Sequence, residues 1–211
     1  MSIVHLFPTP VWKFSLSKHE IYKRRLVKNL EHDFKTRPNL KASWAGLCNT
    51  WQCHMDDVSV PLNDLYDEIM AEVMKFIQHL GVGKSSYYKI VNSWFNVHTH
   101  DMYQEVHEHL PSFISGNYYL QFDPKKDKSL VFVNENKSFF YSSWAMDLPI
   151  MNPELMGKFQ IPDIKEGDVL LFPATLNHFV PKSDPHDQLR ITNSFNILPV
   201  ASPNLILPNN K

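Results

Sequence analysis

Apolar and polar positions alternate differently in the two halves of the chain. Between residues 21 and 34, apolar side chains recur at helical spacing among charged ones, and Pro38 ends the pattern. A second, clearer helix is predicted before Gly81 and Gly83, on an apolar stripe formed by Leu62, Leu65, Ile69, Val73, Phe76 and Ile77. Residues 3–15 alternate loosely and contain prolines, which favours an edge strand. We expect both helices to support a β-sheet.

From Tyr87 onward, short β-rich segments are separated by loops rich in Pro, Asn, Asp and Lys. The segments are Tyr88 to Val97, Ser115 to Phe122, Leu130 to Val133, Asp168 to Phe172 and Arg190 to Leu198. Because no helical pattern separates them, they predict a mainly β fold: an antiparallel double-stranded β-helix of jelly-roll or cupin-like type, with N-terminal supporting helices. We expect one domain, with the strand and helices in 1–86, the core in 87–198 and a tail in 199–211.

Composition and charge narrow the functional classes. Twenty-one basic and 22 acidic residues give a net charge of −1, which argues against charge-driven binding of nucleic acid. The chain has neither a signal-peptide pattern nor an apolar run of about 18 residues, so we expect a soluble protein without membrane contact. Cys48 and Cys53 form neither a C-x-x-C pair nor a disulfide framework, which favours the reducing cytoplasm.

The histidines of the His107-Glu108-His109 segment predict a metal site. Residues i and i+2 of a strand point to the same face, so His107 and His109 can reach one ion while Glu108 points away. A later strand must supply the third ligand, and His178 is the candidate. Imidazole nitrogens suit iron, zinc, copper or nickel, and a facial set of three protein ligands leaves positions open for catalysis. An enzyme is therefore the leading hypothesis.

The order of motifs resembles that of the iron(II)- and 2-oxoglutarate-dependent oxygenases. The motifs are His-Glu-His-Leu-Pro-Ser-Phe-Ile-Ser-Gly-Asn-Tyr-Tyr-Leu at 107–120, Gly-Asp-Val-Leu-Leu-Phe-Pro at 167–173, His178, and Arg-Ile-Thr-Asn-Ser-Phe-Asn at 190–196. The arrangement is similar to the phage and bacterial branch of that superfamily, with a prolyl-hydroxylase-like core. For a phage-encoded protein, the compartment would be the host cytoplasm.

This resemblance implies a role for each matching residue. The iron ligands would be His107, position 109 and His178; the family has Asp or Glu at the second position, whereas this chain has His109. Three neutral imidazoles would then hold the metal unless a carboxylate such as Glu105 or Glu108 moves in. The resemblance also implies that Arg190 binds the distal carboxylate of 2-oxoglutarate through two parallel hydrogen bonds, as a bidentate contact. Tyr119 and Thr192 would bind the same carboxylate.

The implied reaction is hydroxylation of a substrate with O₂, in which 2-oxoglutarate is converted to succinate and CO₂. The substrate could be a protein residue, a nucleobase or a small metabolite, with specificity encoded in loops 99–106 and 134–166. Two alternatives stay open: a three-histidine, cupin-like metal enzyme that does not use 2-oxoglutarate, and a non-catalytic jelly-roll binding or virion-associated protein. An edge strand in 3–15 could also pair across a homodimer.

Residue type and strand alternation also predict where other conspicuous side chains lie. We predict that His98 and His100 lie at the surface, and that the run 125–128 is a solvated turn. On the last strand, alternation places Arg190, Thr192, Ser194 and Asn196 on one face and Ile191, Phe195 and Ile197 on the other. The aromatic residues expected in the core are Trp94, Phe95, Phe113, Phe172 and Phe195.

Overall fold

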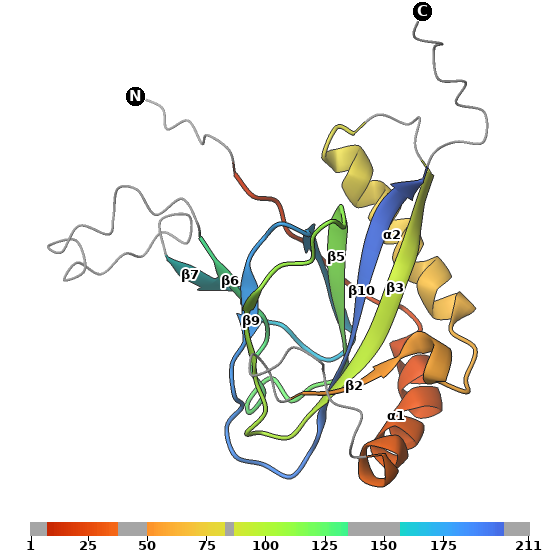
Figure 1. Cartoon of the computed structure of the whole chain (residues 1–211), viewed down its shortest axis with the longest axis vertical. Helices are drawn as coiled ribbons and strands as arrows, with labels where there is room; N and C mark the ends of the chain where they lie inside the picture. The colour runs from red at the N-terminus through yellow and green to blue at the C-terminus, as the bar shows by residue number, and fades with distance from the viewer. Residues whose placement is uncertain (1–7, 38–49, 83–86, 135–156, 201–211) are drawn as a thin grey trace, which may run out of the picture.

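The larger of two antiparallel sheets forms the centre of the molecule in the computed structural model, which describes residues 8–37, 50–82, 87–134 and 157–200 (Figure 1). It has six strands in the order β1-β8-β5-β10-β3-β2. Their bounds are Trp12–Ser15 for β1, Trp51–His54 for β2, Tyr87–His98 for β3, Ile114–Gln121 for β5, Asp168–Pro173 for β8 and Arg190–Val200 for β10.

The smaller sheet packs opposite one face of the larger one and has four strands in the order β4-β9-β6-β7. Its strands are Gln104–His107 for β4, Val131–Val133 for β6, Lys158–Gln160 for β7 and His178–Val180 for β9. Both sheets are antiparallel throughout, so the fold is the expected mainly β jelly roll.

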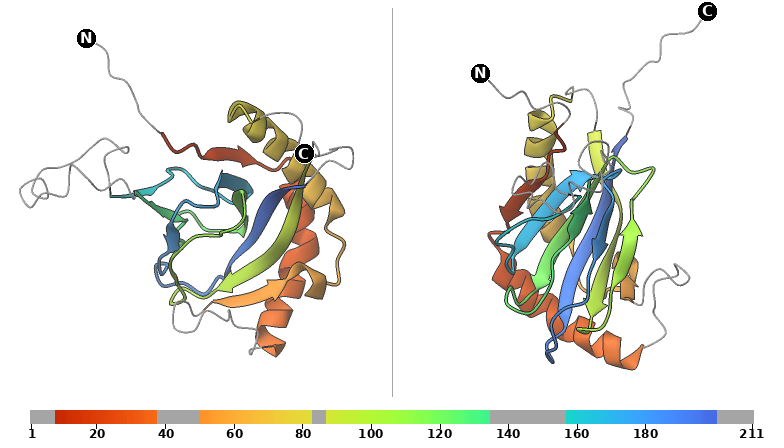
Figure 2. Two further views of the ribbon diagram at one scale, coloured as in Figure 1. Left: turned by 45° about the horizontal axis from the view of Figure 1, so that its top comes forward. Right: turned by 90° about the vertical axis from the view of Figure 1, so that its left-hand side faces the viewer.

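The helices α1 (His19–Thr36) and α2 (Asn63–His79) cover the face of the larger sheet that points away from the smaller one (Figure 2). Each helix buries an apolar stripe. In α1, Leu26 and Leu30 are at most 1% exposed as the spacing predicts, whereas Ile21, which was expected on the same stripe, is 48% exposed and its neighbour Tyr22 is buried instead. Gly81 follows α2 with φ of 69°, a conformation that glycine adopts without strain, and ends the helix as expected.

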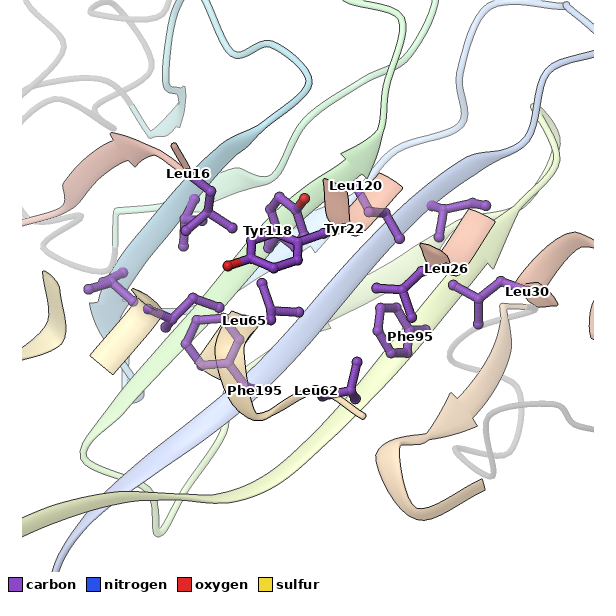
Figure 3. Packing of buried hydrophobic residues seen from close by; sticks show 14 of the residues in the cluster. Leu16, Tyr22, Leu26, Leu30, Leu62, Leu65, Phe95, Tyr118, Leu120 and Phe195 are labelled. Carbon is purple, nitrogen blue, oxygen red and sulfur yellow. The ribbon is translucent and has the colours of Figure 1, made fainter. Parts of the chain in front are cut away.

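Alternation along the strands separates two hydrophobic cores. Tyr118 and Leu120 of β5 point toward the helices, whereas Tyr119 between them points toward the smaller sheet. Figure 3 shows the helix-side core, where Leu26 and Leu65 lie with Phe195 of β10. The second core lies between the sheets and consists of Tyr119, Phe122, Leu130, Phe132, Ile164, Leu170, Phe172 and Val180.

The elements expected from the sequence agree with these bounds. Both helices and the five predicted C-terminal segments are present, and β1 is an edge strand. The short strands β2 and β7 have no clear pattern in the sequence and were not predicted. Strands β4 and β7 also begin inside the segments 99–106 and 134–166, which were expected to be loops. Residues 1–7, Cys48, Gly83, most of loop 134–166 and the tail from 201 lie outside the described residues. No helix among the described residues, including the short 3₁₀ helix Met55–Asp57, has the length and hydropathy needed to cross a bilayer.

Two expectations about histidines were wrong in detail. His98 is 2% exposed and ends β3 in the interior, whereas the sequence analysis placed it at the surface. Strand β3 extends as far as His98 because β10 pairs with it up to this residue, where Arg190 lies opposite His98. Strand β4 ends at His107, so His109 lies in the following loop and reaches the same site through that loop, not through strand alternation.

Candidate active site

Three histidine side chains converge where β4 and β9 pair. His107 and His178 are direct partners in this ladder, and the ligand nitrogens of His107, His109 and His178 all lie within 4.8 Å of one another. The ring centroid of His107 is 4.4 Å from that of His178, and the centroid of His109 is 5.1 Å from both. The structure therefore brings together all three histidines predicted as metal ligands.

Hydrogen bonds to the backbone orient these rings. The Nδ1 atom of His107 lies 2.7 Å from the backbone oxygen of Glu105, and that of His178 lies 2.9 Å from the backbone oxygen of Leu176. Because a carbonyl oxygen only accepts, Nδ1 carries the proton in both rings and Nε2 carries the lone pair. Partners of this kind fix the tautomer of metal-binding histidines. His109 is held by its backbone N–H, which donates to the oxygen of Ala174 at 2.9 Å.

The electrostatic environment keeps the three rings neutral. Burial, and secondly the nearby His107, lower the pKa of His109 to about 4 and that of His178 to about 3. Burial also lowers the pKa of His107. At neutral pH all three imidazoles are uncharged, which is the form that binds a metal ion.

No Asp, Glu or Cys among the described residues joins this histidine group. The side chains of Glu105 and Glu108 are exposed to solvent instead. Nitrogen donors in this number and protonation state fit a divalent transition metal such as Fe(II), with an all-imidazole ligand set.

A second group of potential ligands, formed by His19, Glu20 and Glu166, has a structural explanation. His19 Nδ1 lies 2.7 Å from the Tyr118 hydroxyl, and Lys23 forms a 2.5 Å ion pair with Glu166. These contacts attach the first turns of α1 to the larger sheet, so we assign this group to packing.

Arg190 is a buried cation at the start of β10, only 4% exposed. Its NH1 group donates to the backbone oxygen of Lys128 at 2.5 Å, and its NH2 group contacts Nδ1 of His98. Among the described residues, no carboxylate forms an ion pair with it. Burial lowers its pKa to about 9, which leaves the guanidinium charged at neutral pH. A buried charge without a counter-charge is unfavourable and marks a place for an anion.

The histidine group and Arg190 line one pocket. Tyr119 and Thr192, the two other residues predicted to bind a cosubstrate, line it as well. The Tyr119 hydroxyl accepts a hydrogen bond from the backbone N–H of Leu130 at 3.1 Å. All six predicted site residues thus share a single pocket, whose remaining lining is Trp94, His98, Gln104, Gly116, Asn117, Lys128, Leu130, Phe172, Val180 and Ser194.

Some residues of this pocket were missed by sequence reasoning. Trp94 was assigned to the core only, yet it lines the pocket and its ring centroid lies 5.7 Å from that of His109. Asn96 organises a polar layer beside the pocket, in which its Oδ1 accepts from Gln52 at 2.8 Å and from Gln104 at 3.3 Å. The polar face of β10 was predicted from alternation, but its partners on β3 and in the loops were not.

A family model of the 2OG-Fe(II) oxygenases matches residues 92–196, a range that contains all six predicted site residues. No curated protein sequence matches the chain.

Solved structures with the same fold include a Pseudomonas putida prolyl-4-hydroxylase, with 12% identity, a TM-score of 0.57 and coverage of 90% of this chain and 93% of that one. The carbocyclase SnoK from nogalamycin biosynthesis has 11% identity, a TM-score of 0.58 and coverage of 90% and 79%. HygX from Streptomyces hygroscopicus, solved with nickel, 2-oxoglutarate and hygromycin B, has 13% identity, a TM-score of 0.53 and coverage of 91% and 84%.

Proposed function

Because the chain belongs to the 2OG-Fe(II) oxygenase family, we propose that it is an Fe(II)- and 2-oxoglutarate-dependent dioxygenase that hydroxylates its substrate. In the balanced reaction, substrate C–H, O₂ and 2-oxoglutarate give substrate C–OH, succinate and CO₂. The observation that carries the proposal is one pocket that holds both a converging set of neutral imidazoles and a buried, uncompensated guanidinium.

His107, His109 and His178 would hold the iron. When bound, Fe(II) supplies the redox chemistry that couples decarboxylation of 2-oxoglutarate to oxygen transfer. The backbone oxygens of Glu105 and Leu176 fix two of the rings, so the ligand nitrogens are oriented before the metal arrives. The surrounding aromatic side chains Phe132 and Phe172, at 6.2 and 4.9 Å from the His178 ring centroid, exclude water from one side of the site.

Arg190 would bind the distal carboxylate of 2-oxoglutarate. A guanidinium has five N–H groups, of which the contacts to Lys128 and His98 use two, so donors remain for a carboxylate. Tyr119 and Thr192 lie in the same pocket and would add hydroxyl contacts. The low exposure of Arg190 strengthens its interaction with an anion because water does not screen it.

The all-histidine ligand set is compatible with this cosubstrate. Three neutral ligands leave the ion with its full double positive charge, which favours a dianionic chelating cosubstrate over a neutral one. The same ligand set would also suit a metal enzyme that does not use 2-oxoglutarate, and this is the second candidate function. The buried Arg190 distinguishes the two, because only the first gives this cation an anionic partner.

The decisive experiment is oxygen-dependent formation of succinate from 2-oxoglutarate after anaerobic reconstitution with Fe(II). We expect turnover by the wild type and its loss in both His178→Ala and Arg190→Ala. Arg25→Ala is the matched control: it removes an arginine that is paired with Asp64 at 2.8 Å, outside the pocket, and should leave turnover unchanged. Metal binding without 2-oxoglutarate binding in the wild type would favour the second candidate function.

A further inference from the structure

His98 stands directly opposite Arg190 in the pairing of β3 with β10. Side chains at such positions lie on the same face of the sheet, a few ångströms apart. Both residues are buried, with 2% exposure for His98 and 4% for Arg190, and both line the pocket. His98 is therefore an integral part of the wall that surrounds the uncompensated guanidinium.

The contact with Arg190 determines the tautomer of His98. A guanidinium can only donate hydrogen bonds, so Nδ1 of His98 must accept from NH2. The ring is then neutral and its hydrogen is on Nε2. This Nε2 atom is buried and has no hydrogen-bond partner among the described residues. An orphaned buried donor is costly, which suggests that its partner is a ligand.

We propose that His98 is a further donor of the carboxylate clamp, the group of side chains around Arg190 that would bind the distal carboxylate of 2-oxoglutarate: Nδ1 orients the Arg190 guanidinium, and Nε2–H donates to that carboxylate. This inference rests on the proposed function. A neutral donor adds a hydrogen bond to the anion without placing a second positive charge against Arg190. The bound carboxylate satisfies the orphaned Nε2–H and compensates the buried cation at the same time.

The test is equilibrium binding of two ligands to zinc-loaded protein by calorimetry. 2-Oxoglutarate and 2-oxovalerate share the chelating end, and 2-oxovalerate carries a methyl group where 2-oxoglutarate has the distal carboxylate. His98→Leu should weaken binding of 2-oxoglutarate by about 10- to 100-fold, the usual loss for one hydrogen bond to a charged group, and leave binding of 2-oxovalerate unchanged. His98→Gln restores both an acceptor and a donor, and should remain within about threefold of the wild type.

Histidine nitrogen NMR on the zinc-loaded wild type provides a readout that does not depend on the folding of a variant. The His98 signal should show the Nε2–H tautomer, and its proton resonance should shift on addition of 2-oxoglutarate but not of 2-oxovalerate. The opposite tautomer, or equal responses to the two ligands, would refute the donor role.

Other outcomes separate this inference from the proposed function. If the wild type binds 2-oxoglutarate and His98→Leu binds it equally well, the clamp role of His98 is wrong and the proposed function stands. If His98→Leu weakens the binding of both ligands equally, or if His98→Gln loses as much 2-oxoglutarate affinity as His98→Leu, the role of His98 is packing and the inference is overturned. If the wild type binds 2-oxovalerate as tightly as 2-oxoglutarate, both the clamp and the cosubstrate assignment are wrong.

Discussion

His107 and His178 are direct partners across the ladder of β4 and β9, with ring centroids 4.4 Å apart. The two residues are far apart in the sequence, and only the pairing register of two short strands joins them. A slip of one residue would turn one of the rings to the opposite face of the sheet. The geometry of the candidate metal centre therefore depends on the same hydrogen bonds that hold the smaller sheet together.

Position 109 offers a direct test of the ligand set. Replacing His109 by Asp would restore the acidic ligand of the family pattern, and we expect His109→Asp to retain metal binding because a carboxylate also binds divalent iron. His109→Ala should weaken metal affinity by more than about tenfold, since loss of even an outer partner of a ligand costs that much. Anaerobic titration with Co(II), followed by absorbance, measures both. Wild-type affinity in His109→Ala would show that this residue is not a ligand.

The shape of the Arg190 side chain should matter as well as its charge. Arg190→Lys keeps a positive charge but cannot present a planar pair of donors, and it loses the contacts to His98 and the Lys128 backbone. We expect 2-oxoglutarate affinity to fall by about tenfold or more, measured by calorimetry on metal-loaded protein. Thr192→Val, which removes one neutral hydroxyl from the same pocket, should cost less. Equal affinities of Arg190→Lys and wild type would contradict a two-pronged contact.

The metal-free protein should lose stability in mild acid because of His178. Burial, aided by His107, lowers its pKa from 6.5 to about 3, so the unfolded chain takes up a proton that the folded protein excludes. This proton uptake does not affect the free energy of unfolding above pH 6.5. As the pH falls below 6.5 it lowers the free energy of unfolding, by about 2 kcal/mol at pH 5. His178→Phe keeps an aromatic ring beside Phe132 and Phe172, and should remove the His178 share of this acid sensitivity. The share of His109, whose pKa burial lowers to about 4, should remain.

Thermal unfolding of the metal-free proteins at pH 7 and pH 5 measures that difference. The midpoint of the wild type should fall more between the two pH values than that of His178→Phe. Identical falls would place the acid sensitivity in other groups.

Gly116 of β5 should not tolerate a side chain. A methyl group at this position would lie 2.2 Å from Cζ of Phe195 and 3.0 Å from Cδ2 of Leu171, both fully buried in the helix-side core. We expect Gly116→Ala to destabilise the protein by about 1–3 kcal/mol, measured by urea denaturation. The cost should shrink when Phe195→Leu provides space in the double variant. An unchanged cost in that background would mean that the backbone, not the Phe195 ring, limits this position.

Local periodicity predicted much of the architecture because it reflects which face of an element is buried. The stripe that ends at Ile77 identified α2, and the alternation of Ile191, Phe195 and Ile197 identified the core face of β10, as the packing confirms. The three-residue strands β7 and β9 are too short for a periodic pattern, so His178 could be placed on a strand only from the need for a third ligand.

The sequence by itself thus determined the mainly β fold, the two supporting helices and the candidate residues of the site, because residue type and local alternation carry that information. Only the tertiary structure decided that His98 faces Arg190 and that His109 reaches the other histidines from a loop. Both facts follow from the pairing of strands distant in sequence. Such pairing is set by the whole core, and no local pattern around His98 distinguishes a surface histidine from one that completes a buried pocket.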